Sequence, residues 1–208
     1  MERALLEIIA SDPSRLRATI VTTASVKWKH QNKYALFTKR TFDRLGFRLT
    51  DFIDIEQDDP RRLLKYDLIY LNGGNPFYLL KFARETGTLD ILHMAYQRGI
   101  TLVGASAGSI LFGPDISIAQ TFYPHLNLIQ LQDLKAANLV GFTILPHYNK
   151  LRYLDTLVDE RLQMFSNNIP YRVIPLSNGS GVLAYDKQSI SVIGNDNRLE
   201  QTESSNRG

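Results

Sequence analysis

The stretch Ile100-Thr101-Leu102-Val103-Gly104-Ala105-Ser106-Ala107-Gly108 decides the fold class of this chain. A short apolar run leads into a Gly-x-Ser-x-Gly turn, and a helical pattern follows the turn. This order predicts a strand, a sharp turn and a helix, the geometry that holds a serine hydroxyl above the carboxyl end of a parallel strand. Ala105 and Ala107 fit such a turn because only small neighbours fit where the chain approaches itself closely.

The same strand, loop and helix unit occurs again on the N-terminal side. The run Asp67–Leu71 ends in the glycine-rich loop Asn72–Pro76, and helix-like sequence continues from Phe77 to Arg84. Further strands are predicted at 18–23 and 49–55, and further helices at 33–45 and 88–98, which Gly46 and Gly99 are placed to end. Because parallel strands need crossover helices and bury both faces, we predict an α/β fold: a three-layer, mostly parallel sheet with helices on both faces.

The two ends of the chain continue this pattern less regularly. A short helical pattern at 3–10 precedes the first strand. A strand at Phe142–Leu145, a helix near Arg152–Phe165 and β-like runs at 171–174, 181–185 and 189–193 follow the central units. The length of 208 residues suits one domain over residues 1–208. We expect the polar tail from about residue 195 to fray.

Composition restricts the possible classes of function. The chain has 24 Lys and Arg against 21 Asp and Glu, and the basic residues are scattered, which favours a solvated surface over a nucleic-acid site. It has no Cys, which excludes disulfides, Cys-ligated metal and a thiol nucleophile. The N-terminus does not have the pattern of a secretory signal, and no apolar run has the length of a membrane span. We therefore expect a cytoplasmic protein without nucleic-acid or membrane partners.

Ser106 is the first candidate for chemistry, as a nucleophile at the strand-to-helix turn. The following helix N-terminus favours developing negative charge. The alternative is a glycine-rich turn in which Ser106 only caps the helix. Gly74, in the loop after the neighbouring predicted strand, could join Ala107 in an oxyanion hole of backbone N–H groups, although paired glycines also occur simply where a turn needs positive φ. Asn75 in the same loop is a candidate for substrate binding.

A serine nucleophile needs a base, and His147 is the best placed of the four histidines. It follows the strand Phe142–Leu145 directly, so it lies at the same sheet edge as Ser106 if that strand joins the sheet. A carboxylate should orient the base, and the nearest candidates between Ser106 and His147 are Asp115 and Asp133. Each also has a structural interpretation, Asp115 as a turn residue after Gly113-Pro114 and Asp133 as a cap.

Three blocks together resemble the dipeptidase E and cyanophycinase family of serine peptidases: Leu71-Asn72-Gly73-Gly74-Asn75-Pro76-Phe77-Tyr78-Leu79-Leu80, Gly104-Ala105-Ser106-Ala107-Gly108-Ser109, and Leu145-Pro146-His147-Tyr148. The likeness spans residues 18 to 190 and includes an Asn178-Gly179-Ser180-Gly181 turn before the last strands. It implies a fold related to class I glutamine amidotransferases, with serine in place of the nucleophilic cysteine. It also implies hydrolysis of short peptides without a cofactor, in dipeptidase E after an N-terminal aspartate.

The chain departs from that family at several places. Helix-like sequence replaces the usual first strand, Pro76 stands where threonine is common, and the usual triad acid aligns near Pro124-His125, where there is no carboxylate. Either Asp115 or Asp133 substitutes, or a backbone carbonyl or water orients His147, or the hydrolase is impaired. The missing acid makes a non-catalytic binding module with a vestigial site a rival hypothesis. An esterase for small acyl esters is a second rival, because it uses the same machinery and differs mainly in the leaving group.

An aspartate-specific site also needs a cation for the substrate carboxylate. Lys27, Lys29, Arg152 and Arg172 are candidates, and their spacing does not choose among them. Oligomeric state is equally open at this point, a monomer or a homodimer.

Overall fold

The structure, a computed structural model, describes residues 2–186 and 189–195. The strands are β1 (Arg17–Val21), β2 (Leu49–Ile53), β3 (Leu68–Leu71), β4 (Thr101–Gly104), β5 (Phe142–Pro146), β6 (Arg172–Leu176), β7 (Gly181–Ala184) and β8 (Ile190–Ile193). The α-helices are α1 (Glu2–Ile9), α2 (Lys33–Arg44), α3 (Pro76–Glu85), α4 (Thr88–Gln97), α5 (Ala107–Ile110), α6 (Ser117–Phe122), α7 (Tyr148–Leu154) and α8 (Val158–Asn167). Short 3₁₀ helices lie at η1 (Pro13–Arg15), η2 (Lys29–Gln31), η3 (Pro60–Lys65) and η4 (Pro124–Leu126).

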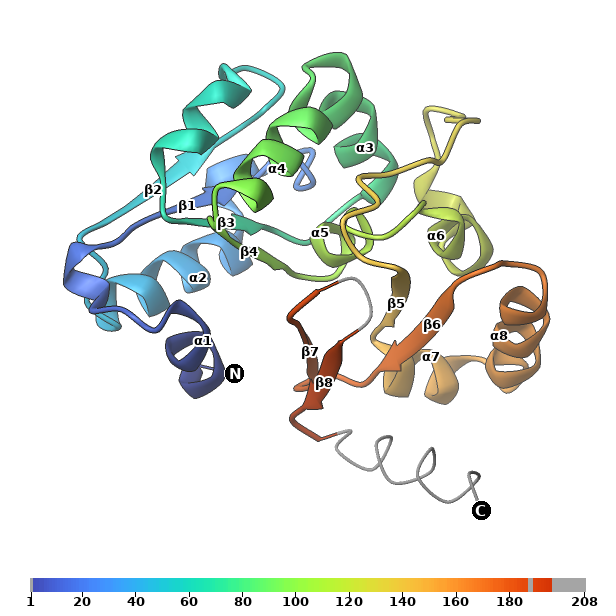
Figure 1. Cartoon of the computed structure of the whole chain (residues 1–208). Helices are drawn as coiled ribbons and strands as arrows, with labels where there is room; N and C mark the ends of the chain where they lie inside the picture. The colour runs from blue at the N-terminus through green and yellow to red at the C-terminus, as the bar shows by residue number, and fades with distance from the viewer. Residues whose placement is uncertain (1, 187–188, 196–208) are drawn as a thin grey trace.

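A four-stranded parallel sheet in the order β2-β1-β3-β4 forms the centre of the fold. All of its neighbouring strands pair in parallel, so the carboxyl ends of β1, β3 and β4 lie at one edge. Helices α3 and α4 lie on one side of this sheet, and α1 and α2 on the other (Figure 1). The predicted α/β class, with a parallel sheet between helical layers, is confirmed.

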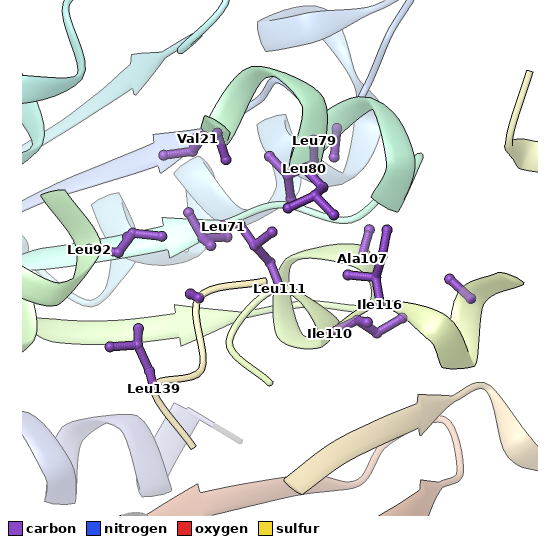
Figure 2. Close-up of a cluster of buried hydrophobic side chains, with 14 of the residues drawn as sticks. Val21, Leu71, Leu79, Leu80, Leu92, Ala107, Ile110, Leu111, Ile116 and Leu139 are labelled. Carbon is purple, nitrogen blue, oxygen red and sulfur yellow. The ribbon is translucent and has the colours of Figure 1, made fainter. Parts of the chain in front are cut away.

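Alternation of side chains along the strands explains the two helical layers. In β3, Leu68 faces a cluster that includes Phe42 of α2, whereas Ile69 and Leu71 face a second cluster with the helices of the opposite side. Figure 2 shows Leu71 among Leu79 and Leu80 of α3 and Leu111 at the end of α5. The larger cluster therefore anchors the turn that carries Ser106, because α5 contributes Ala107 and Ile110 to it.

The strand that precedes His147 does not extend this sheet. Strand β5 pairs with β6 alone among the described strands, and β7 and β8 form a separate antiparallel hairpin. A third apolar cluster holds these strands together, with Phe142 and Ile144 of β5, Ile174 and Leu176 of β6, and Val192 of β8. In Figure 1 the hairpin lies between the end of β4 and the β5–β6 pair.

Two local expectations meet different outcomes. The helical pattern at 3–10 forms α1, and its Leu5 and Ile9 pack against the cluster around α2. The prediction of one helix near Arg152–Phe165 is wrong, since α7 ends at Leu154 and α8 begins at Val158. Asp155 interrupts the helix: its backbone is extended and its side chain accepts a hydrogen bond from the Leu157 amide at 2.9 Å.

Two further expectations concern the ends of the chain and the membrane. The expectation that the tail frays from about residue 195 applies to residues 196–208, which lie outside the described residues. Within the described ranges, no helix is long and apolar enough to cross a bilayer.

Candidate active site

Ser106 lies in a strained turn between β4 and α5. Its backbone has φ 50° and ψ −113°, a combination that is costly for a residue with a side chain and that is concentrated at functional sites. The flanking glycines are sterically required. A Cβ on Gly104 would lie 2.6 Å from the Ser109 backbone, and a Cβ on Gly108 would lie 2.1 Å from the Leu71 carbonyl oxygen. The Gly-x-Ser-x-Gly pattern therefore reflects close packing of this turn against β3 and α5.

His147 lies at the carboxyl end of β5, with its side chain directed at Ser106. Its Nε2 is 3.1 Å from Ser106 Oγ, although β5 and β4 belong to different sheets. The His147 backbone is left-handed, at φ 60°. Immediately before it, the Pro146 carbonyl accepts a hydrogen bond from the Tyr123 hydroxyl at 2.9 Å. Burial raises the pKa of Tyr123 from 10.0 to about 12, so this hydroxyl remains a donor well above neutral pH.

The partner of His147 on its other side is Asn178. His147 Nδ1 is 2.7 Å from Asn178 Oδ1. An amide oxygen only accepts, so Nδ1 carries the proton and Nε2 is left to accept the Ser106 hydroxyl. The three side chains therefore form a chain of hydrogen bonds from serine through histidine to an uncharged amide.

The turn that carries Asn178 is fixed from two directions. The backbone N–H of Asn178 donates to Asn149 Oδ1 at 2.9 Å, and the Asn178 carbonyl accepts from Asn195 Nδ2 at 3.3 Å. A Cβ on Gly194 would lie 2.2 Å from the Gly179 carbonyl oxygen, so the turn packs tightly against the end of β8. These contacts hold the amide of Asn178 toward His147.

Neither expected carboxylate lies in this position. Asp115 accepts hydrogen bonds from Ser117 and from the Tyr171 hydroxyl, the latter at 2.6 Å. Asp133 caps the Lys135 amide at 3.0 Å and forms an ion pair with Arg84 at 3.0 Å. The prediction that one of them orients His147 is therefore wrong. Both are local turn residues, the alternative that their sequence positions also allowed.

Sequence reasoning missed the role of Asn178 for two reasons. The carboxylates predicted to orient His147 lie between Ser106 and His147 in the sequence, whereas Asn178 comes 31 residues after the histidine. The signal was present in the Asn178-Gly179-Ser180-Gly181 turn, but a turn motif does not reveal which way its first side chain points.

The backbone N–H groups of Gly74 and Ala107 are the oxyanion-hole donors that the sequence predicts. Neither Gly74 nor Ala107 donates its N–H to another described residue. Ala107 is the first residue of α5, where N–H groups have no intrahelical acceptor. The Gly74 loop lies against the turn, since a Cβ on Gly73 would be 3.2 Å from Ser106 Cβ. Gly74 itself has φ 151°, and a Cβ there would lie 2.1 Å from the Ala24 carbonyl oxygen.

Asn75 has a structural role that the sequence did not anticipate. Its Oδ1 accepts from the Phe77 and Tyr78 amides at the start of α3, and its Nδ2 donates to the Leu126 carbonyl at 2.7 Å. The side chain therefore caps a helix and ties it to η4. These contacts oppose the expectation that Asn75 binds substrate.

A cavity of about 620 Å³ opens beside Ser106 and His147. Among the described residues that line it, Asp186 carries the only formal charge at neutral pH when histidine is neutral, and no Lys or Arg is present. Three of the candidate cations have other contacts: Lys27 lies over the Trp28 ring, Lys29 is paired with Asp54 and Glu56, and Arg152 is paired with Asp159. Arg172 does not line the cavity either. Within the described ranges, no group of three or more His, Asp or Glu side chains could hold a metal ion.

Comparisons with known proteins identify the family of the chain and related folds. The sequence matches the model of peptidase family S51 over residues 2–193. It is 28% identical over 177 residues to an uncharacterized peptidase of Listeria monocytogenes, covering 83% of this chain and 84% of that protein. It is 29% identical over 173 residues to a probable alpha-aspartyl dipeptidase of Drosophila melanogaster, covering 78% of this chain and 68% of that protein. The crystal structure of a Listeria monocytogenes protein described as a peptidase E has the same fold, with a TM-score of 0.76, 23% identity and 93% of each chain covered.

Proposed function

We propose that this chain, which belongs to peptidase family S51, cleaves short peptides through an acyl-enzyme formed on Ser106. His147 is the general base, and Asn178 takes the place of the triad acid. The single observation that carries this proposal is the chain of hydrogen bonds from Ser106 Oγ to His147 Nε2, at 3.1 Å, and from His147 Nδ1 to Asn178 Oδ1, at 2.7 Å.

The proposed reaction follows from these contacts. Ser106 Oγ attacks the carbonyl carbon of the substrate while its proton passes to His147 Nε2. The carbonyl oxygen becomes an oxyanion, and the N–H groups of Gly74 and Ala107 stabilise it. The C–N bond then breaks, and the protonated imidazole gives its proton to the leaving amine. Water attacks the acyl-enzyme in the same manner, with His147 again as the base, and releases the acid and free Ser106.

Asn178 orients His147 as a triad carboxylate does, but it supplies no negative charge. Its Oδ1 fixes the tautomer and the ring orientation of His147, as the Asn of Cys-His-Asn peptidases does. It carries no charge, so it stabilises the protonated imidazole less than a carboxylate does. We therefore propose an active enzyme whose base is well oriented but weakly supported electrostatically.

One of the two rival hypotheses, the non-catalytic binding module, loses its main motivation at this point. A non-catalytic binding module was suggested by the missing triad acid, and Asn178 supplies His147 with the partner that such a module lacks. An esterase uses the same groups on a different leaving group, so it differs in substrate and not in site. Three expectations remain predictions for this chain: a cytoplasmic location, a monomer or homodimer, and cleavage of dipeptides with an N-terminal aspartate. The fly relative is named a probable alpha-aspartyl dipeptidase, which supports the last of these.

Labelling by a fluorophosphonate tests the proposal. Ser106 Oγ forms a bond to phosphorus, fluoride leaves, and the serine proton passes to His147. Mass spectrometry should find the label on Ser106 of the wild type and little label on His147→Ala. His30→Ala, which removes another exposed histidine, is the matched control and should label like the wild type. A folded wild type without label, or label that is unchanged in His147→Ala, would overturn the proposal.

A further inference from the structure

The carbonyl oxygen of Ser106 accepts three hydrogen bonds from the start of α5. The backbone N–H groups of Ser109 and Ile110 donate to it at 3.0 and 3.1 Å, and the Ser109 hydroxyl donates to it at 2.6 Å. The two backbone bonds belong to the turn of the helix itself. The third bond comes from a side chain, so it depends on which residue stands at position 109.

The same carbonyl shares a peptide group with the N–H of Ala107. A trans peptide group is planar, and its C=O and N–H bonds point in opposite directions. No cis peptide bond occurs among the described residues. Whatever fixes the direction of the Ser106 carbonyl therefore also fixes the direction of the Ala107 N–H, one of the two proposed donors to the oxyanion.

This peptide group needs to be held, because the backbone of Ser106 is strained. At φ 50° and ψ −113° the residue lies outside the favoured regions. Rotation of the peptide group by roughly 180° would bring Ser106 close to the less costly left-handed region. It would also turn a carbonyl oxygen, in place of the Ala107 N–H, toward the oxyanion. Each hydrogen bond to the Ser106 carbonyl opposes that rotation.

Ser109 is itself fixed in position. A Cβ on Gly104 would lie 2.6 Å from the Cα and the backbone nitrogen of Ser109, so the end of β4 packs directly against this residue. Ala107 and Ile110, on the same short helix, pack in the larger apolar cluster (Figure 2). The Ser109 side chain is half-buried beside the cavity. Its hydroxyl is therefore held where it meets the Ser106 carbonyl.

We propose that Ser109 is a positioning residue, whose hydroxyl holds the Ser106–Ala107 peptide group so that the Ala107 N–H faces the oxyanion. The inference rests on the proposed function of Ser106. The bond from Ser109 ends on the Ser106 carbonyl and not on the Ser106 hydroxyl or on His147. Loss of this bond should therefore slow attack by Ser106 without changing the protonation of His147.

The rate of fluorophosphonate labelling measures this effect without a known substrate, because the phosphoryl oxygen takes the place of the oxyanion. Ser109→Ala should lower the second-order rate constant for labelling of Ser106 roughly 3- to 10-fold, the effect of one lost hydrogen bond. Ser109→Thr keeps the hydroxyl and should label close to the wild-type rate. Ser109→Cys changes the shape less than alanine does, and its thiol is a weaker donor, so it should also label more slowly than the wild type.

Thr86 at the end of α3 provides a matched control. Its backbone N–H and its hydroxyl also donate to one carbonyl, that of Phe82, at 3.0 and 2.7 Å. Thr86→Val removes this hydroxyl and should label at the wild-type rate. Thermal unfolding should show a similar loss of stability in Ser109→Ala and Thr86→Val, so a difference in labelling reports the position of the bond and not stability.

The pH dependence of labelling separates an effect on the oxyanion site from an effect on His147. The ratio of the wild-type rate to the Ser109→Ala rate should stay constant from about pH 6 to pH 9, since a serine hydroxyl does not titrate in that range. A shift of the acidic limb in Ser109→Ala would show that Ser109 acts through His147, which contradicts the inference.

The labelling rates also separate this inference from the proposed function. If the wild type labels and folded Ser109→Ala loses less than about threefold in rate, the inference is wrong and the proposed nucleophile stands. An equal loss in Thr86→Val, or a folded Ser109→Thr as slow as Ser109→Ala, would overturn the inference as well. If folded wild type takes no label, the proposed function fails, and the inference fails with it.

Discussion

His147 Nδ1 and Asn178 Oδ1 lie 2.7 Å apart, so the imidazole that we propose as the base is oriented by an amide and not by a carboxylate. The contact joins the end of β5 to the turn after β6, and Asn149 and Asn195 hold that turn in place. Asn178 thus takes the position of a triad acid, but it carries no negative charge.

The first prediction concerns this amide. Asn178→Ala should lower kcat roughly 5- to 150-fold, the equivalent of losing a hydrogen bond worth about 1–3 kcal/mol. Asn178→Asp should raise kcat/KM roughly fivefold and move the acidic limb of the pH–rate profile to higher pH, because a carboxylate stabilises the protonated imidazole. The same substitutions at Asn167, an exposed residue at the end of α8, serve as controls. Unchanged kinetics in Asn178→Ala would remove Asn178 from the mechanism.

A second prediction concerns the two aspartates that the sequence suggested. Asp115→Asn and Asp133→Asn should each leave kcat/KM within about twofold of the wild type, because neither carboxylate contacts His147. Asp115→Asn should still lower the free energy of unfolding by about 1 kcal/mol, since it weakens the bonds to Ser117 and Tyr171. Steady-state kinetics and urea unfolding check both parts. A hundredfold loss of kcat in either variant would show a catalytic role that the geometry does not provide.

The third prediction concerns the oxyanion site. Gly74→Ala places a Cβ 2.1 Å from the Ala24 carbonyl oxygen, so the loop must shift and carry the Gly74 N–H away from Ser106. Loss of one such donor corresponds to a drop of about 10²- to 10³-fold in kcat. Gly46→Ala is the control: it also has positive φ, at 86°, but its Cβ meets nothing within 4 Å. That variant should cost about 1 kcal/mol of stability and leave kcat unchanged.

The fourth prediction concerns Tyr123 at alkaline pH. Burial raises the pKa of its hydroxyl from 10.0 to about 12. Because the folded pKa lies above the unfolded one, the stability contributed by the neutral hydroxyl is fully present below pH 10. The free energy of unfolding then falls as pH rises from about 10 to about 12, where the hydroxyl ionises more readily in the unfolded chain. Tyr123→Phe should make this decline shallower. It should also lower kcat severalfold at every pH from 6 to 9, because the bond to the Pro146 carbonyl next to His147 is lost. A pH-dependent loss within that range would contradict this account.

The sequence by itself determined the fold class and the position of the proposed nucleophile. Alternation of apolar runs and helical patterns fixes a parallel sheet between helical layers, because parallel strands need crossover connections. The Gly-x-Ser-x-Gly turn follows from local sterics, since Gly104 and Gly108 leave no room for a Cβ. His147 was also identified, because its place directly after an apolar strand is a local property of the chain.

Only the tertiary structure decided what lies around these residues. The sequence left open whether β5 joins the sheet. It pairs with β6 instead, and His147 still reaches Ser106 because the two strand ends converge in space. Asn178 becomes the partner of His147 through a turn 31 residues further along the chain. The cavity beside Ser106 and His147 likewise depends on how separate sheets pack, because strands of different sheets line it. Local sequence patterns report periodicity and turn sterics, whereas contacts between distant segments depend on packing that no single segment encodes.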